Sequence, residues 1–277
     1  MIPFDFAYFK PNTLSEAVQI YQTFAAQDMQ PLYYGGGTEC LTRARRNSLT
    51  ADAVIDLKGI PECNSIDWQN QWLVLGATVS LTKLSSDHSF PLLAETVAQI
   101  ADRTARNKIT LGGNICGKLI YREAVLPFLL TDALVLTMGP KGLQYKSIHE
   151  VFQRQMRLET GEFVVQFLLE KTYAMLPYVS IKKRRVGHVG YPLVSIAACK
   201  QSDRIHAAFS GVCAFPFRSK EIEDELSQSA VSYDTRIERA VKHLPAPVLK
   251  NVEGAADYRE FVFKQALRET LERLDGV

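Results

Sequence analysis

Pro31-Leu32-Tyr33-Tyr34-Gly35-Gly36-Gly37-Thr38-Glu39 is the first of two glycine-rich turns in this sequence, and Ile109-Thr110-Leu111-Gly112-Gly113-Asn114 is the second. Each turn follows a short apolar run. Because glycine has no Cβ atom, it lets the chain bend sharply and lets main-chain N–H groups approach a ligand closely. Successive N–H groups in such a bend form a nest that binds anions. The pair of turns therefore indicates a site for a long ligand that carries a diphosphate.

Neither turn is specific alone, because glycine clusters after strands are mostly ordinary turns. The chain contains no Gly-x-x-x-x-Gly-Lys-Ser/Thr motif, so a P-loop is excluded. The triple glycine does not extend to Gly-x-Gly-x-x-Gly, since Cys40 stands where the last glycine would fall. A Rossmann nucleotide-binding fold is therefore not indicated.

The composition is that of an ordinary globular protein. Of the 277 residues, 47% are hydrophobic and 22% charged, so the chain can bury a large core divided over two or three lobes. Its formal net charge of +2 gives no reason to expect nucleic acid or an anionic membrane as the main partner. No apolar run approaches the ~20 residues of a membrane helix. Residues 1–6 lack the basic start and long apolar segment of a signal peptide, so we expect a cytoplasmic protein.

The cysteines are odd in number and widely spaced, and no Cys-x-x-Cys pair occurs; the five are Cys40, Cys63, Cys116, Cys199 and Cys213. This pattern argues against a disulfide framework, a zinc site or an iron–sulfur cluster held by this chain alone. Cys40 and Cys116 lie just beyond the two turns and are candidates to approach the ligand. The alternative, which we favour, is that each is a small buried apolar residue.

Periodicity and turn residues predict a mixed order of helices and strands. Thr13 and Glu16 have the spacing of a capping box, and apolar residues then recur at helical intervals to about Ala26. Further helices are expected over residues 90–101, 123–131 and 258–274. Strands are expected over residues 32–34, 53–57, 72–77, 132–137, 163–169, 179–183, 193–199 and 205–213. The apolar stripe expected in the last helix consists of Phe261, Val262, Ala266, Leu267, Leu271 and Leu274.

This order predicts an α+β fold. Residues 1–58 and 59–176 have the pattern of two α/β lobes. In residues 177–277, three strands followed by helices indicate a small α+β domain.

The two turns, in this order after a helical N-terminal segment, resemble those of the FAD-binding medium subunit of the molybdenum hydroxylases. That family includes xanthine dehydrogenases and carbon monoxide dehydrogenases. The resemblance covers essentially the whole chain, including the opening phrase at residues 6–11 and the basic segment at residues 182–185. It implies a two-lobed FAD-binding domain of the vanillyl-alcohol-oxidase (PCMH) type. A C-terminal domain of the carbon monoxide dehydrogenase flavoprotein type would follow.

The resemblance also implies which residues bind FAD, without a covalent bond. The first turn would wrap the diphosphate, and the second would add to the site. Glu123 stands nine positions after Asn114, where the family usually has an aspartate bonded to the cofactor. Val164 matches an apolar position that contacts the flavin, and Lys182 matches a basic position near it. The implied FAD-binding residues are Leu32, Tyr33, Tyr34, Gly35, Gly36, Gly37, Thr38, Glu39, Cys40, Thr110, Leu111, Gly112, Gly113, Asn114, Glu123, Val164 and Lys182.

One stretch departs from the family pattern. Many relatives have small residues after the second turn, whereas this chain has Lys118-Leu119-Ile120-Tyr121-Arg122. Its two basic residues either lie beside the flavin or are solvated surface charges. The role of Glu39 is also open: it either accepts a hydrogen bond from a backbone amide or from ribose hydroxyls, or is a carboxylate favoured at a helix N-terminus.

The flavin itself supplies redox chemistry, so we expect no catalytic acid–base residue and no metal site in this chain. The resemblance implies a large molybdopterin subunit that oxidises hypoxanthine or xanthine, and a small subunit whose 2Fe-2S clusters pass electrons to the FAD. Reduced flavin would deliver them to NAD+ or oxygen, as in a xanthine (purine) dehydrogenase. The alternatives are a stand-alone flavin reductase or oxidase of the same fold, and a scaffold subunit that has lost FAD.

Overall fold

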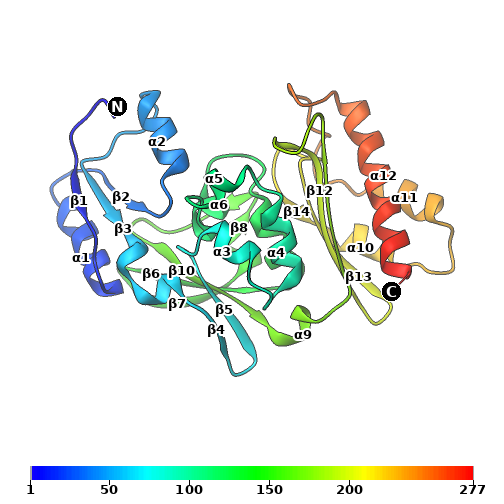
Figure 1. Cartoon of the computed structure of the whole chain (residues 1–277), viewed down its shortest axis with the longest axis horizontal. Coiled ribbons are helices and arrows are strands. Elements are labelled where there is room, and N and C mark those ends of the chain that lie inside the picture. The colour runs from blue at the N-terminus through cyan, green and yellow to red at the C-terminus, as the bar shows by residue number, and fades with distance from the viewer. Residues whose placement is uncertain (1, 277) are drawn as a thin grey trace. The chain divides into compact units, whose positions relative to one another are not determined.

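The structure is a computed structural model that describes residues 2–276. The chain forms two compact units, each assembled from separate stretches of sequence (Figure 1). The first unit contains residues 2–83, 103–118 and 133–169, and the second contains residues 84–102, 119–132 and 170–276. The mixed helix and sheet content confirms the expected α+β class. The division of the chain at residues 58 and 176 stays a prediction.

A three-stranded parallel sheet begins the first unit, in the order β1 (Ala7–Phe9), β3 (Ala53–Asp56) and β2 (Pro31–Tyr34). Helix α1 (Leu14–Ala25) covers one face of it, and its Tyr21 ring stacks on Tyr33 with 5.0 Å between ring centroids. The predicted N-cap is confirmed, because the Thr13 hydroxyl accepts a hydrogen bond from the N–H of Glu16. The Glu16 carboxylate accepts in turn from the N–H of Asn12.

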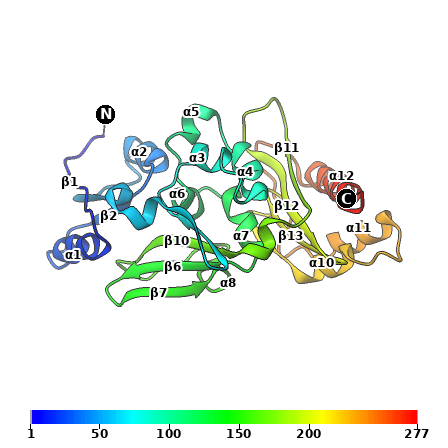
Figure 2. The same cartoon turned by 60° about the horizontal axis from the view of Figure 1, so that its bottom comes forward.

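A five-stranded sheet forms the rest of the first unit's framework. Its order is β4 (Ile66–Gln69), β5 (Trp72–Gly76), β10 (Phe163–Glu170), β6 (Leu134–Gly139) and β7 (Gly142–Ser147) (Figure 2). The central strand β10, expected over residues 163–169, is buried along seven of its eight residues. Around the two sheets lie the short elements α2 (Thr38–Arg45), η1 (Leu57–Gly59), η2 (Pro61–Asn64), α3 (Leu81–Ser85), α5 (Arg103–Arg106), α6 (Leu111–Cys116), α8 (Ile148–Val151), β8 (Phe152–Gln153) and β9 (Gln155–Met156).

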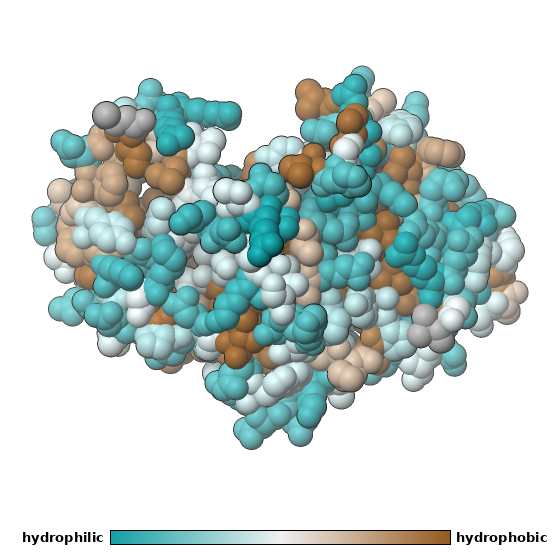
Figure 3. Space-filling view, viewed as in Figure 1, coloured by the Kyte–Doolittle hydropathy of each residue, from teal (hydrophilic) through white to brown (hydrophobic). Residues whose placement is uncertain are grey.

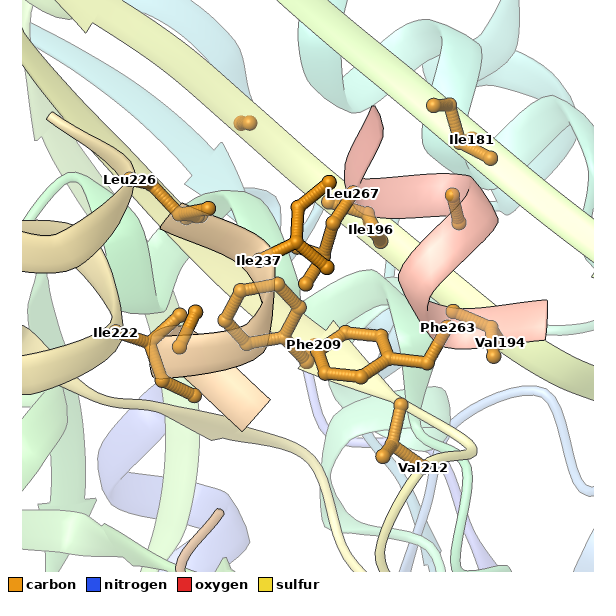
Figure 4. Close-up of a cluster of buried hydrophobic side chains, with 14 of the residues drawn as sticks. Ile181, Val194, Ile196, Phe209, Val212, Ile222, Leu226, Ile237, Phe263 and Leu267 are labelled. Carbon is orange, nitrogen blue, oxygen red and sulfur yellow. The ribbon is translucent and has the colours of Figure 1, made fainter. Parts of the chain in front are cut away.

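An antiparallel sheet of four strands is the centre of the second unit, in the order β11 (Tyr178–Arg184), β12 (Pro192–Gln201), β13 (Arg204–Ser210) and β14 (Phe217–Arg218). The helices of this unit are α4 (Pro91–Ala98), η3 (Glu123–Val125), α7 (Leu126–Leu130), α9 (Lys171–Ala174), α10 (Lys220–Leu226), α11 (Tyr233–Val241) and α12 (Ala256–Asp275). Apolar side chains from the strands and from the last three helices form one buried cluster, in which the rings of Phe209 and Phe263 meet edge to face (Figure 4).

The C-terminal helix differs from the prediction in its buried face. Phe261 is 57% exposed, and Phe263 stands in the core instead. The same face also buries Arg259 completely. Its guanidinium donates to the carbonyls of Leu249, Leu193 and Gly211, so hydrogen bonds compensate the burial of the charge. An apolar stripe drawn from sequence had no reason to include an arginine.

Candidate functional site

The first glycine turn leads directly into helix α2. Gly37 is the N-cap residue and has a φ of 74°, a left-handed conformation that glycine adopts without strain. The N–H of Leu41 bonds to the Gly37 carbonyl and closes the first helical turn. The N–H groups of Thr38, Glu39 and Cys40 precede that bond, so they have no carbonyl four residues back within the helix. The end of the turn therefore presents a row of donors of the kind that binds phosphate.

The two glycine turns contact each other. A Cβ atom on Gly36 would overlap the carbonyl oxygen of Lys108, which directly precedes the second turn. A Cβ atom on Gly35 would lie 2.7 Å from the hydroxyl oxygen of Thr110. The expected convergence of the two turns is thus present. The missing Cβ atoms are needed first for the approach of one turn to the other.

The second turn uses its own N–H groups within the protein. Gly113 donates to the Thr110 hydroxyl at 3.1 Å, and Gly112 donates to the carbonyl of Ala77 at 2.8 Å. The Asn114 N–H donates to the Thr110 carbonyl. These bonds differ from the exposed backbone patch that the sequence suggested. The second turn therefore supports the first turn. The candidate N–H donors for a phosphate are those at the start of α2.

Glu39 joins helix α2 to the chain beyond the second turn. Both of its carboxylate oxygens accept from the N–H of Lys118 at 2.9 Å. Of the three roles left open by the sequence, the hydrogen bond to a backbone amide is observed, and Glu39 also lies in the first turn of α2. Gly117 makes this possible, because a Cβ atom there would lie 2.7 Å from a Glu39 oxygen. The backbone N–H of Lys118 is thus hydrogen-bonded, while the residue itself is exposed to solvent.

Two cavities of the first unit adjoin the turns, and both are bordered by Tyr34, Thr78 and Thr110. The larger has a volume of about 440 Å³ and lies between α2 and the face of the three-stranded sheet opposite α1. Hydrophobic residues gather at the surface beside the N-terminal part of the described chain (Figure 3). Phe6 and Leu41, which border the larger cavity, are exposed. The smaller cavity, about 160 Å³, is bordered by Gly112, Gly113, Cys116, Phe163 and Val164, among others.

These cavities locate several of the residues expected to bind FAD. Leu32, Gly36 and Cys40 border the larger cavity. Val164, far away in the sequence, borders the smaller one beside both turns. Tyr33 also borders the smaller cavity, while its hydroxyl donates to the Gly161 carbonyl and its ring packs on Phe163. Leu111 is fully buried and anchors the second turn. The FAD contacts of these residues stay predictions.

Glu123 and Lys182 lie in the second unit, where they bind each other. The Lys182 ammonium donates to one carboxylate oxygen of Glu123 at 2.7 Å, and the Ser195 hydroxyl donates to the other at 2.5 Å. Both ionic side chains are at least 94% buried. Burial lowers the pKa of Lys182, although the adjacent carboxylate opposes this shift. The pair is therefore a preformed polar group, and its expected role toward the cofactor stays a prediction.

The remaining candidates are placed as follows. Arg122 is buried, with a φ of 35°, so it is no solvated surface charge. The favoured prediction that Cys40 and Cys116 are small buried residues is wrong. Cys40 is half-buried and Cys116 is exposed, whereas the other three cysteines are buried. Within residues 2–276, none of the five forms a disulfide. Among residues 2–276, no group of three or more His, Cys, Asp or Glu side chains is placed to hold a metal ion.

Sequence reasoning missed the polar residues beside the first turn. Lys58 donates to the Gly35 carbonyl at 2.6 Å and to Asp56 at 2.8 Å, and both side chains border the larger cavity. Lys108 borders it as well. In the sequence, Asp56 and Lys58 are ordinary residues at the end of a strand. Only the parallel pairing of β2 with β3 brings them next to the turn.

The site fits the diphosphate of an FAD molecule. A row of N–H donors begins helix α2, and the neighbouring cavities have volumes suited to parts of a dinucleotide.

Within residues 2–276, no helix is both long and apolar enough to span a membrane.

Comparison with known proteins assigns the class. The model of the FAD binding domain in molybdopterin dehydrogenase matches residues 4–169, more than half of the chain. The chain therefore belongs to this family, and its first 169 residues contain an FAD-binding domain.

Particular relatives match this chain over different shares of its length. The nicotinate dehydrogenase FAD-subunit of Eubacterium barkeri is 22% identical over 98% of this chain and 98% of its own. The xanthine dehydrogenase FAD-binding subunit of Escherichia coli O157:H7 is 27% identical over 59% of this chain and 58% of its own. A solved chain of carbon monoxide dehydrogenase from Hydrogenophaga pseudoflava shares the fold, with a TM-score of 0.88 and 22% identity, over 100% of this chain and 99% of that one.

Proposed function

We propose that this chain is the FAD-carrying electron-transfer subunit of a multi-subunit xanthine (purine) dehydrogenase. Partner subunits carry the molybdopterin centre, which oxidises a purine such as hypoxanthine or xanthine, and the 2Fe-2S clusters. Electrons then pass through the FAD of this chain to NAD+ or oxygen. We place the complex in the cytoplasm, where cysteines that form no disulfide, such as those of this chain, remain reduced.

The observation that carries the proposal is the contact between the two turns at the start of α2. It places the start of α2, with the N–H groups of Thr38, Glu39 and Cys40, at the larger cavity, which Gly36 and Cys40 border. N–H donors at a helix N-terminus bind phosphate through hydrogen bonds and through the helix dipole. The chain therefore holds two phosphates without a cluster of arginines.

The other residues of the site orient and enclose. When bound, the flavin supplies the group that accepts and passes on electrons. The hydrogen bonds from the Lys118 N–H to Glu39 hold the start of α2 in place, and with it the N–H donors proposed for the diphosphate. Leu32 and Val164 offer apolar walls that exclude water. Electron transfer through the flavin requires no acid–base residue of this chain.

Assignment of the purine rests on the xanthine dehydrogenase relative, which is 27% identical over 59% of this chain, against 22% over 98% for the nicotinate dehydrogenase relative. The placement of the clusters on a partner is supported by the scattered cysteines of this chain. The free thiols are distributed over both units rather than gathered at one site.

The first experiment tests the cofactor. The chain, expressed with its partners absent, is purified and its absorbance is recorded before and after denaturation. We expect a yellow protein or a colourless apo-protein that takes up FAD, with all flavin released by denaturation. A chain that neither contains nor takes up FAD is the scaffold of the third hypothesis. Steady turnover of a small substrate by the isolated chain favours the stand-alone reductase or oxidase.

A second experiment tests the substrate and acceptor. The assembled complex is purified through a tag on this chain and assayed with hypoxanthine, xanthine and nicotinate, each with NAD+ under argon and with oxygen alone. We expect the purines to be oxidised. Oxidation of nicotinate without purine oxidation overturns the purine assignment and leaves the FAD assignment intact.

A further inference from the structure

A cluster of three polar side chains lies against the first glycine turn. The Lys58 ammonium donates to the Gly35 carbonyl at 2.6 Å and to the Asp56 carboxylate at 2.8 Å. It also lies over the ring of Tyr34, 4.6 Å from the centroid. The second oxygen of Asp56 accepts from the Tyr8 hydroxyl at 2.5 Å. Three strands of one sheet thus combine to hold one lysine on one carbonyl.

Asp56 is built to be an ionised anchor. It is 3% exposed, and the backbone N–H of Lys58 donates to it in addition to the two side chains. Burial opposes ionisation of this carboxyl, but the hydrogen bonds from Lys58 and Tyr8 outweigh that effect and hold its pKa below the usual value. Tyr8 shows the reciprocal effect, because donation to Asp56 raises the pKa of its hydroxyl to about 12. Asp56 is therefore ionised and Tyr8 protonated throughout the neutral range.

The bond to the Gly35 carbonyl has a consequence for the next residue. A peptide group is planar and trans, so its C=O and N–H bonds point in opposite directions. Fixing the Gly35 oxygen on Lys58 therefore fixes the direction of the Gly36 N–H, away from the ammonium. Without that bond, glycines on both sides of the peptide leave its orientation free, because glycine populates both signs of φ.

We propose that Lys58 is a positioning residue for the FAD diphosphate: anchored by Asp56 and Tyr8, it fixes the Gly35–Gly36 peptide in the orientation that the bound diphosphate requires. The inference rests on the proposed FAD site and deepens it. It assigns to Lys58 a role in the geometry of the turn, distinct from the attraction of a positive charge for phosphate.

The test separates geometry from charge by three variants. Lys58→Met removes the ammonium and the bond to Gly35. Lys58→Arg keeps a charged donor. Asp56→Asn removes a negative charge from the neighbourhood, so attraction through space predicts tighter FAD binding, whereas loss of the anchor predicts weaker binding. Lys83→Met removes the same charge as Lys58→Met from an exposed position of the first unit and serves as the matched control.

FAD binding to each full-length apo-protein is measured by quenching of flavin fluorescence, at low and at high salt. We expect Lys58→Met and Asp56→Asn each to weaken binding about 10-fold, the value of one lost charge-assisted hydrogen bond. The loss should persist at high salt, since screening weakens through-space attraction but not a direct contact. Lys58→Arg should restore binding to within about 3-fold, and Lys83→Met should bind as the unaltered chain does.

Tighter binding by Asp56→Asn, or a Lys58→Met effect that disappears at high salt, overturns the proposal in favour of simple charge attraction. Unchanged binding by Lys58→Met overturns it outright. Thermal unfolding of each apo-variant is recorded alongside, and a variant that does not fold is replaced by Tyr8→Phe, which removes the outer hydroxyl of the anchor. Failure of the unaltered chain to bind FAD is a different result, because it refutes the proposed function itself.

Discussion

Gly36 shows how much one residue decides in this site. Its position is set by the Lys108 carbonyl, which lies where a side chain would begin. Glycine is favoured at position 37 for a different reason, because the φ of 74° at Gly37 is unfavourable for other residues. At Gly35, Lys58 holds the carbonyl while Thr110 occupies the space beside the Cα atom. Each glycine of the turn is therefore constrained by a different neighbour.

Substitution of Gly36→Ala is expected to separate the turns and to weaken FAD binding by at least about 10-fold. The added Cβ atom overlaps backbone, which does not move aside as a flexible side chain does, and overpacking of this kind costs about 1–3 kcal/mol. FAD titration of the variant and its urea unfolding measure the two effects.

The matched control is Gly142→Ala, in the turn between β6 and β7. Gly142 has a φ of 85° but nothing within 4 Å of an added Cβ atom, so the substitution introduces backbone strain without a clash. It should lower stability by about 1–2 kcal/mol and leave FAD affinity unchanged. Wild-type affinity in Gly36→Ala would contradict the role of the contact between the turns.

Among the elements, helix α1 is the one whose start was predicted most closely. Its amphipathic pattern, its cap and its end near residue 26 agree with the helix Leu14–Ala25. Short helices such as α2 were missed, because eight residues with little apolar periodicity resemble a loop. Local signals are strong only where a long helix repeats them over several turns.

Thr13→Ala should lower the free energy of unfolding by about 1 kcal/mol, because the Glu16 N–H loses its acceptor at the start of α1. Ser15→Ala, two residues further along at an exposed position, is the control. It should be neutral or slightly stabilising, since alanine is the better helix former. Equal losses in both variants, measured by urea unfolding, would contradict a capping role.

A polar network joins β13, β14 and α10 in the second unit and should respond to pH. Arg218 contacts the Nδ1 atom of His206 at 2.9 Å and bonds to the fully buried Glu223 and to Asp132. Burial lowers the pKa of His206 below 6.5, although Glu223 opposes this shift. The unfolded chain therefore binds a proton more readily than the folded chain does.

Stability should consequently fall as the pH drops below about 6.5, because the unfolded state then holds more protons. Urea unfolding at pH 7.5, 6.5 and 5.5 measures the slope, and His206→Gln should reduce it. His88→Gln is the control. A slope that is the same in the His206 variant would assign the effect to other groups.

At the scale of the whole molecule, the chain passes between its two compact units several times. The second unit takes residues 84–102 and 119–132 from the middle of the sequence. The hydroxyl of Ser210 donates to the Tyr121 carbonyl at 2.6 Å, and Arg218 donates to the Leu129 carbonyl at 3.0 Å. Helix α7 thus packs against a sheet whose first strand begins about 50 residues later in the chain.

We therefore expect residues 177–277, expressed as a fragment, to lack stable tertiary structure. Without the two middle segments, the fragment exposes apolar surface and lacks the Tyr121 and Leu129 carbonyls that accept from Ser210 and Arg218. Its amide NMR spectrum should be poorly dispersed, whereas the second unit within the full chain should show slow amide exchange. A well-dispersed fragment with cooperative unfolding would support the three-part division at residues 58 and 176.

The sequence by itself determined the class of fold, most of the strands, the long helices and the two glycine turns, because each of these is written in local periodicity or in residues with special backbone freedom. It also pointed to the family through the order of the turns. It did not indicate Lys58, Asp56 or the burial of Arg259, since nothing in a local pattern distinguishes such residues from surface charges.

Tertiary structure alone decided which groups meet. Pairing of β2 with β3 brought Lys58 to the first turn, and the approach of the second turn to residue 77 gave the Gly112 N–H its acceptor, the carbonyl of Ala77. Likewise, only the folded chain brings the N–H of Lys118 to the carboxylate of Glu39, which accepts its hydrogen bond. These contacts join residues 20 to 80 positions apart, so their energies depend on how distant segments are placed in space, which no local stretch of sequence encodes.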